Sequence, residues 1–282
     1  MFNFDPDLVN RLSPHLERVL VIDPYETSAK LAAEIFRALG AWRVETVDAS
    51  RRGYERADAW SPHLILSEFS APGIDGAAYP RAIRRSTFGC RRVPIIVASS
   101  QTKASDIITA RDAGAHEFLR KPFSATDLKR RVENVVLKGR PWIEAMAYVG
   151  PDRRRFNTGG YSGSKRRDSD RKIERGQTDG ERFTQALAIL SAAIKHFDAD
   201  PVQATRAMHS QVETLAAMAN ELGQPTLVYA VTAMDRYLST ASQSGSHRLI
   251  HALLEEGVNP LNDLSLVGTA LELNRPGEKI AA

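Results

Sequence analysis

The sequence predicts a protein in two parts: an α/β domain with a doubly wound, five-stranded parallel sheet, followed by an all-α helical bundle. Three observations support this prediction. Short apolar runs alternate with amphipathic helical patterns up to about residue 138. A stretch rich in Gly, Ser and Arg then interrupts the pattern. Beyond about residue 181 the apolar residues recur only at helical spacing.

The first part alternates strands and helices in a regular order. Its first apolar run, at residues 19–23, is typical of a strand that is buried on both faces of a parallel sheet. Gly40 ends the helix after it, and Pro94 leads into the fourth strand. The expected strands cover residues 19–23, 44–47, 64–68, 93–99 and 116–119. The expected helices cover residues 26–39, 54–60, 77–85, 105–113 and a longer segment after residue 122.

The second part carries apolar stripes at spacings of three and four residues. The first stripe consists of Phe183, Leu187, Leu190, Ile194 and Phe197. Asp200 and Pro201 are typical of the cap and first turn of the next helix. The expected helices cover residues 181–197, 201–222, 225–238, 247–256 and 261–272. Because each helix buries one face, we expect an antiparallel bundle of four or five helices.

The positive charge is concentrated between the two parts. Residues 151–176 contain nine Lys/Arg and four Asp/Glu, a net charge of +5, whereas the whole chain carries +4. The rest of the chain therefore sums to −1, and we expect both flanking parts to be close to neutral. The predicted organisation is an N-terminal extension (1–17), the α/β domain (18–138), a basic linker (139–180), the helical domain (181–275) and a tail (276–282).

The composition predicts a cytoplasmic protein. No apolar stretch approaches the ~20 residues that span a bilayer, and the N-terminus lacks the basic start and apolar core of a secretory signal. Cys90 is the only cysteine, which excludes an intrachain disulfide and a cysteine-cluster metal site. We find no catalytic set of side chains, so we do not expect an enzyme or a membrane-inserted protein.

Four polar side chains fall at the carboxyl ends of predicted strands: Asp23, Glu68, Ser99 and Lys121. In doubly wound folds these ends meet in one crevice, where the chemistry of the fold takes place. Glu68 ends the apolar run Leu64-Ile65-Leu66-Ser67 and is followed by a turn rich in Pro and Gly. Lys121 is followed by Pro122 and Phe123.

Residues 18–137 resemble the receiver domain of bacterial response regulators. The resemblance rests on the four strand ends together with Pro72-Gly73-Ile74-Asp75-Gly76, Lys121-Pro122-Phe123 and the segment from Asp112 to Leu119. It implies a flavodoxin-like fold, a role in two-component phosphorelay signalling, and a histidine kinase or a downstream signalling protein as partner. In that family an aspartate stands where this chain has Glu68, and it accepts a phosphoryl group with the help of Mg²⁺.

The chain departs from the family pattern at two positions of the Mg²⁺ site. The family has two adjacent acids after the first strand, but here Asp23 is followed by Pro24, and Glu68 is one methylene longer than aspartate. Both changes disturb the octahedral oxygen shell that Mg²⁺ requires and the positioning that phosphoryl transfer requires. We therefore expect a vestigial metal site at Asp23 and Glu68, with at most weak Mg²⁺ binding and no cofactor.

The remaining residues of the pattern are present. By resemblance, Ser99 matches the hydroxyl residue that receives the phosphoryl oxygen, Lys121 matches the lysine that pairs with it, and Phe118 matches the aromatic switch residue. Glu68 is long enough to reach Lys121 and to form a charge-assisted hydrogen bond with it. Three alternatives follow: a permanently active-like site, an inactive scaffold held by an ion pair, and phosphorylation of Glu68 or another residue.

The basic segment offers a second functional hypothesis. Arginines at 166, 167 and 171 spell Arg-Arg-x-x-x-Arg, which is similar to the motif by which PilZ domains bind cyclic di-GMP. Guanidinium groups suit phosphates, and Tyr148 and Tyr161 offer stacking faces. The candidate ligand residues are Arg153, Arg154, Arg166, Arg167 and Arg171. The alternative is a solvated linker, and we do not expect nucleic acid as a partner.

The helical domain resembles a histidine phosphotransfer domain only faintly. Its candidate, His209, lacks the Lys-Gly that follows the phosphorylated histidine of that family. We therefore interpret His209 as an ordinary helix residue and the bundle as a docking or self-association module. The sequence does not indicate the oligomeric state. The whole sequence predicts a signalling protein that binds partner proteins without being phosphorylated. The alternative is an effector protein that binds a cyclic dinucleotide.

Overall fold

The computed structural model describes residues 2–100, 103–153, 179–243 and 256–261. The chain divides into two compact units. The first unit consists of Met1–Ile143 and Tyr148–Gly163, and the second consists of Glu144–Ala147 and Ser164–Ala282. Each unit has a hydrophobic core of its own.

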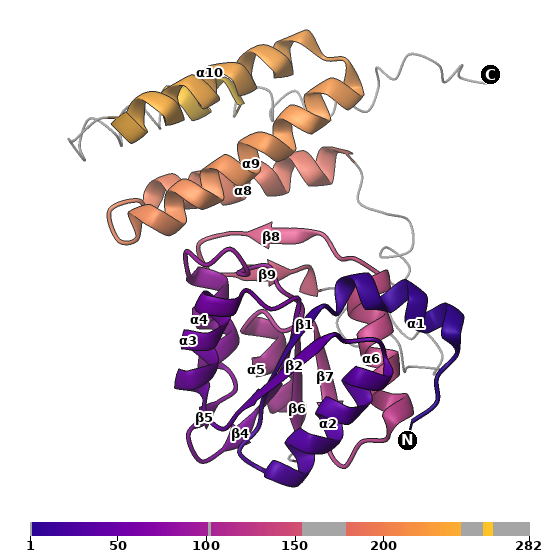
Figure 1. Cartoon of the computed structure of the whole chain (residues 1–282). Coiled ribbons are helices and arrows are strands. Elements are labelled where there is room, and N and C mark those ends of the chain that lie inside the picture. The colour runs from indigo at the N-terminus through magenta and orange to yellow at the C-terminus, as the bar shows by residue number, and fades with distance from the viewer. Residues whose placement is uncertain (1, 101–102, 154–178, 244–255, 262–282) are drawn as a thin grey trace. The chain divides into compact units, whose positions relative to one another are not determined.

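The first unit contains the predicted five-stranded sheet, in which every neighbouring pair of strands is parallel (Figure 1). The strands follow the order β2-β1-β3-β6-β7, the flavodoxin-like order of doubly wound sheets. The doubly wound α/β fold is therefore confirmed. The strands are β1 (Arg18–Ile22), β2 (Arg43–Val47), β3 (Leu64–Glu68), β6 (Ile95–Ser99) and β7 (Glu117–Arg120).

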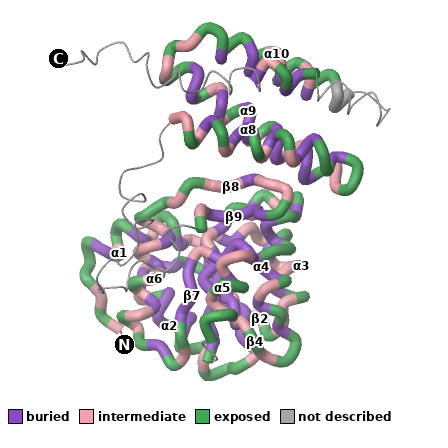
Figure 2. Tube along the Cα trace, turned by 180° about the vertical axis from the view of Figure 1, so that it is seen from behind, coloured by how far each residue is buried: buried purple, intermediate pink, exposed green. Residues whose placement is uncertain are grey.

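Helices cover both faces of this sheet because successive strand residues point to opposite sides. Val19 and Val21 pack in one apolar cluster with residues of α1, α2 and α6, whereas Leu20 and Ile22 pack in another with residues of α3, α4 and α5. Four of the five strands are largely buried between these layers, whereas β2 at the edge of the sheet is not (Figure 2). The helices are α1 (Pro6–Leu12), the 3₁₀ helix η1 (Ser13–His15), α2 (Glu26–Ala38), α3 (Ser50–Trp60), α4 (Ala78–Arg85), α5 (Ala104–Asp112) and α6 (Ala125–Leu137).

The N-terminal residues are part of this domain, although the sequence was interpreted as an extension over residues 1–17. Leu8, Leu12 and Leu16 are buried in the cluster that contains α2 and α6. Asp5 caps α1 by accepting a hydrogen bond from the backbone N–H of Asp7 at 3.1 Å. Helix α1 has only seven residues, so its apolar spacing does not distinguish it from a tail in the sequence.

Two hairpins were not predicted. The first pairs β4 (Ser70–Ala71) with β5 (Ile74–Asp75), directly after Glu68. The second pairs β8 (Trp142–Glu144) with β9 (Val149–Pro151), inside the range that was interpreted as a linker over residues 139–180. The start of that range is therefore structured, whereas residues 154–178 lie outside the described residues.

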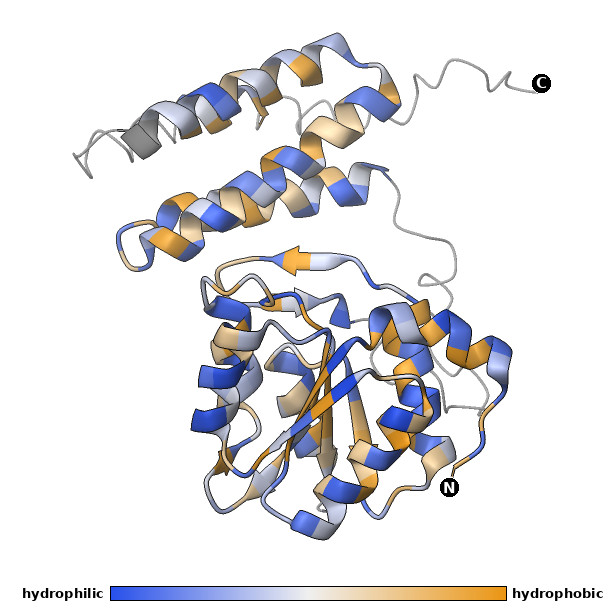
Figure 3. Ribbon diagram, in the orientation of Figure 1, coloured by the Kyte–Doolittle hydropathy of each residue, from blue (hydrophilic) through white to orange (hydrophobic). Residues whose placement is uncertain are grey.

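The described residues of the second unit from Asp179 onward are mainly helical, as predicted. It contains α8 (Asp179–Lys195), α9 (Pro201–Leu222) and α10 (Pro225–Gln243), and residues 256–261 are also helical. All five residues of the first predicted stripe are buried, and Figure 3 shows the mixture of apolar and polar residues along each helix. Asp200 caps α9 by accepting from the N–H of Gln203 at 3.0 Å. Most residues of the last two predicted helices lie outside the described part.

The expectation that both flanking parts are close to neutral is wrong. Residues 1–150 contain 22 Lys/Arg and 18 Asp/Glu, a net charge of +4, whereas residues 177–282 contain 7 and 12, a net charge of −5. The net charges of these two parts add to −1, so the whole-chain charge does not reveal them. Among the described helices, none is long and apolar enough to cross a membrane.

Candidate functional site

The residues predicted to form a site lie at the carboxyl ends of three strands of the sheet. Asp23 follows β1, Glu68 ends β3 and Lys121 follows β7. Strands β1 and β3 are neighbours in the sheet, so their two acids lie at the same edge. Burial is almost complete, with Asp23 7 % and Glu68 3 % exposed.

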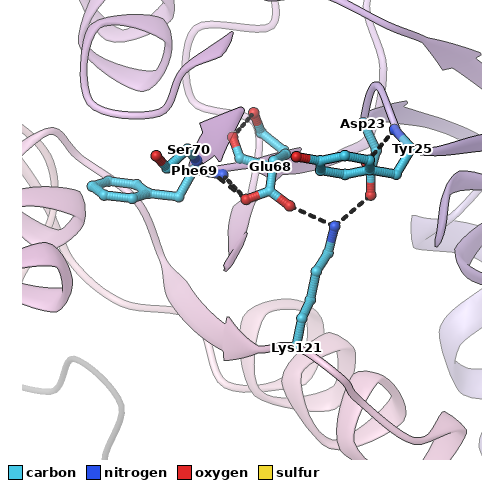
Figure 4. Close-up of polar contacts among 7 residues, drawn as sticks. Asp23, Tyr25, Glu68, Phe69, Ser70 and Lys121 are labelled. Carbon is cyan, nitrogen blue, oxygen red and sulfur yellow. Dashed lines mark hydrogen bonds and ion pairs between the residues drawn. The ribbon is translucent and has the colours of Figure 1, made fainter. Parts of the chain in front are cut away.

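Lys121 joins the two acids. Its ammonium nitrogen lies 2.5 Å from Oδ2 of Asp23 and 2.5 Å from Oε2 of Glu68. Figure 4 shows the lysine side chain extending up to the two carboxylates, with its nitrogen between them. One cation therefore neutralises part of two buried negative charges, and both contacts are charge-assisted hydrogen bonds.

The second oxygen of each carboxylate is bound by the backbone. Oδ1 of Asp23 accepts from the N–H of Tyr25 at 2.9 Å. Oε1 of Glu68 accepts from the N–H groups of Phe69 at 2.9 Å and Ser70 at 3.1 Å. All four carboxylate oxygens of the pair therefore already have hydrogen-bond donors.

The hairpin after Glu68 explains why two N–H groups converge on its carboxylate. Its strands pair Ser70 with Asp75, and the chain returns so closely that the N–H of Gly76 donates to the carbonyl of Phe69 at 2.9 Å. A Cβ at Gly76 would lie 2.3 Å from that carbonyl oxygen, so only glycine allows this approach. The Pro-Gly turn noted in the sequence therefore helps to position the two N–H groups that bind the Glu68 carboxylate.

The arrangement does not fit Mg²⁺. A divalent ion needs several free oxygen ligands, but the Lys121 ammonium stands between the two acids and the other oxygens accept backbone N–H groups. Pro24 supplies no carboxylate next to Asp23. Among the described residues, no group of three or more His, Cys, Asp or Glu is placed to hold a metal ion.

The other two residues of the predicted constellation are buried nearby in the fold. Ser99 ends β6 and is completely buried, and its carbonyl accepts from the N–H of Lys121 at 2.7 Å. Phe118 is 3 % exposed and points into the core that contains α3 to α5. Its ring lies edge-on to Phe69 with centroids 6.0 Å apart. Phe69 thus contacts both the Glu68 carboxylate, through its N–H, and the Phe118 ring.

Tyr25 was missed by the sequence interpretation. Its ring centroid lies 5.8 Å from the Lys121 nitrogen, and 53 % of the residue is exposed. A cation at this distance from an aromatic ring is attracted by it. Its place in the sequence could have indicated this role. Tyr25 directly follows Asp23-Pro24, and residues that follow a strand end in this fold border the crevice.

The described part of the arginine segment is engaged within the first unit. Arg153 pairs with Asp112 at 3.1 Å, and its guanidinium lies 4.4 Å from the centre of the Tyr148 ring. Tyr148 is buried and donates its hydroxyl to the carbonyl of Pro151 at 2.6 Å, so it is not an open stacking face. The other candidates, Arg154, Arg166, Arg167 and Arg171, lie outside the described residues, so the cyclic di-GMP hypothesis stays a prediction.

Comparison with known proteins identifies the class of the first unit's domain. Residues 19–133 match the family model of the response regulator receiver domain. Chemotaxis protein CheY of Pseudomonas aeruginosa is 23 % identical over 118 residues, which cover 42 % of this chain and 94 % of CheY. KdpE of Escherichia coli, described as the KDP operon transcriptional regulatory protein, is 36 % identical over 90 residues, or 32 % of this chain and 38 % of KdpE.

Solved structures include similar chains. A putative response regulator from Chloroflexus aurantiacus has a TM-score of 0.41 and 24 % identity, and the match covers 43 % of this chain and 98 % of that one. Chemotaxis protein CheY4 of Vibrio cholerae has a TM-score of 0.40 and 22 % identity, with 43 % and 98 % covered. By the family model and the CheY relatives, residues 19–133 form a CheY-like receiver domain.

Proposed function

We propose that this protein is a cytoplasmic, non-enzymatic signalling protein whose receiver domain works without phosphorylation, by binding partner proteins. The proposal rests on one observation: Lys121 bridges Asp23 and Glu68, with both contacts at 2.5 Å. The ammonium takes the place between the acids that a cation would need, and Glu68 has the wrong length for the family's phosphoacceptor. Phosphoryl transfer would therefore lack both free carboxylate oxygens to hold its metal and the aspartate that accepts the phosphoryl group in the family.

The inward position of Phe118 supports an active-like form of this domain. A buried Phe118 together with a bridged Glu68 and Lys121 is the combination expected of a site with a permanent charge at the acceptor position. Phe69 connects the two, since it binds the Glu68 carboxylate and packs against Phe118. A histidine kinase or a downstream signalling protein would recognise this fixed form.

Intact-mass spectrometry after incubation with acetyl phosphate and Mg²⁺ tests the proposal. The full chain should gain no phosphate. The double variant Pro24→Asp with Glu68→Asp restores both family acids while keeping Ser99 and Lys121, so it should gain one phosphate and serves as the positive control. A phosphate adduct on the unchanged protein, labile to base, would overturn the proposal.

A further inference from the structure

The hairpin β8–β9 contributes four residues to the helical unit. Glu144–Ala147 belong to the second unit, although Ile143 before them and Tyr148 after them belong to the first. Within the second unit, Glu144 is 2 % exposed and Met146 packs against the hydrophobic core. The packing of the helical unit therefore includes a short segment that lies far ahead of its first helix, α8, in the sequence.

Two glutamines of α9 hold these four residues. The side-chain amide of Gln203 donates to Oε1 of Glu144 at 3.0 Å and to the carbonyl of Ala145 at 3.3 Å. The amide of Gln211 donates to the carbonyl of Glu144 at 3.3 Å. Both glutamines are buried, and they lie about two turns apart along α9. The helix therefore binds the segment through its backbone and through its one charged side chain.

The contact with the segment explains why a glutamine stands at position 203. Its Oε1 has no hydrogen-bond donor among the described residues, although Gln203 is almost completely buried. A buried amide oxygen without a donor costs stability, so an apolar side chain would serve the packing of the helices better. The amide nitrogen makes both of the bonds to the segment, and this is the role that Gln203 fits.

The covalent path from the segment to the helices is long. The structure describes the chain up to Arg153, and α8 begins at Asp179. The 25 residues between them, 154–178, can span at most on the order of 80 to 90 Å. The covalent path therefore allows the segment to meet α9 of its own chain or α9 of another. Exchange of an identical element between two copies is a low-cost route to a dimer.

We propose that Gln203 and Gln211 of α9, here called the segment site, bind residues 144–147 of a second copy of this chain in exchange for the chain's own. Each copy carries the same Glu-Ala-Met-Ala segment, so the segment site fits that of another copy as well as its own. The covalent tie raises the local concentration of a chain's own segment. The exchange therefore increases with protein concentration. It goes beyond the proposed receiver function and does not rest on the bridge at Lys121.

A fluorescent peptide of residues 140–149 tests the segment site in the full chain. Glu144→Ala with Met146→Ala, the segment variant, leaves the segment site intact and should bind the peptide in a saturable way, measured by fluorescence anisotropy. The unchanged protein should bind it at least about tenfold more weakly, because its own segment competes. Gln203→Met with Gln211→Met, the site variant, keeps the side-chain volume but loses the amide donors, so it should not bind.

The folded state of each variant is checked by circular dichroism, and Met146→Ala alone is the milder replacement if the double change unfolds the helices. A matched peptide with Glu144→Lys should bind the segment variant at least about tenfold more weakly, because an amide donor then faces a cation. No saturable binding to a folded segment variant would overturn the proposal, and so would equal binding to the site variant.

Mixing the two variants tests the second copy as the occupant. The segment variant has an intact segment site and the site variant has an intact segment, so the two should complement each other. A fluorophore on the segment variant alone follows it in sedimentation velocity. The equimolar mixture should contain a species that sediments faster than either variant does by itself. If the mixture sediments as the separate variants do, the second copy is not the occupant, even where the peptide binds.

Discussion

At the scale of single residues, Lys121 acts as a cation supplied by the chain itself. Two acids that lie side by side and nearly out of solvent would repel each other strongly without it. The ammonium relieves this repulsion and occupies the space between Asp23 and Glu68. The extra methylene of Glu68 is compatible with this bridge because Phe69 and Ser70 hold its other oxygen.

Lys121→Met should destabilise the first unit by about 3 to 5 kcal/mol, because it leaves two buried carboxylates without their counter-charge. Urea unfolding measures the loss. Mg²⁺ should raise the melting temperature of this variant and not that of the unchanged protein, since the oxygens released by Lys121 become available. Lys129→Met, which removes a 3.7 Å pair with Glu133 on α6, should cost less than about 1 kcal/mol. Equal losses in the two variants would contradict a special role of Lys121.

His116 should make the protein sensitive to acid. It is half-buried, and its Nδ1 faces Arg84 at 3.2 Å and the N–H of Ile95 at 3.3 Å, so it is an acceptor and uncharged. Burial first, then Arg84 and Arg140, hold its pKa well below the usual value. The unfolded chain therefore binds a proton that the folded protein does not. Stability should fall by about 1.4 kcal/mol per pH unit below about pH 6.5 from this group.

His116→Gln retains an acceptor and cannot titrate, so its unfolding free energy should depend less on pH between about pH 5 and 6.5. Urea titrations at several pH values measure the difference. His209→Gln, at an exposed position of α9, is the control. If both variants keep the same acid slope as the unchanged protein, His116 is not its source.

At the scale of elements, the hairpins decide details that periodicity cannot predict. The hairpin β4–β5 positions the N–H groups at Glu68. The hairpin β8–β9 packs against the turn before β7, where Gly114 has a φ of +91°. Strands of two or three residues are too short to show alternation, so only the Pro-Gly turn of the first hairpin could be predicted.

Gly114→Ala should therefore destabilise the first unit by about 2 kcal/mol or more. A left-handed backbone is strained for alanine, and its Cβ would lie 2.8 Å from both the Arg84 Cγ and the carbonyl oxygen of Val149. Gly89→Ala is the matched control, because a Cβ there meets nothing within 4 Å. It should be neutral or stabilise by up to about 1 kcal/mol. Urea unfolding of both variants checks the difference, and similar losses would refute the clash.

At the scale of the whole molecule, the chain has two units with separate cores. Leu190 lies in the core of the helical unit and Ile96 in that of the receiver domain, and neither has exposed surface. Units with their own cores can unfold as separate cooperative steps. Residues 1–150 carry a net charge of +4 and residues 177–282 a net charge of −5, a difference that the whole-chain charge conceals.

Differential scanning calorimetry should accordingly show two transitions. Leu190→Ala and Ile96→Ala should each destabilise one unit by about 2 to 5 kcal/mol through the cavity they create. Each variant should shift one transition and leave the other in place, so each is the control of the other. A single transition that moves with both variants would contradict two-step unfolding.

Much of the fold followed from the sequence alone. Buried parallel strands and amphipathic helices leave strong periodic signals, and strand ends in a doubly wound sheet converge on one crevice. The sequence therefore predicts that Asp23, Glu68, Ser99 and Lys121 lie at one edge of the sheet. The identity of residues 24 and 68 was enough to predict that the usual metal and acceptor chemistry is disturbed.

Only the tertiary structure decided how those residues use their charges. The contacts of Lys121 with both acids, the burial of Phe118 and the approach of Gly76 to Phe69 depend on side-chain directions and loop closure. The convergence of three arginines on Trp142 joins α4 and its following loop to a strand some fifty residues later. Sequence patterns report which face of an element is buried, but contacts between distant elements are set by packing.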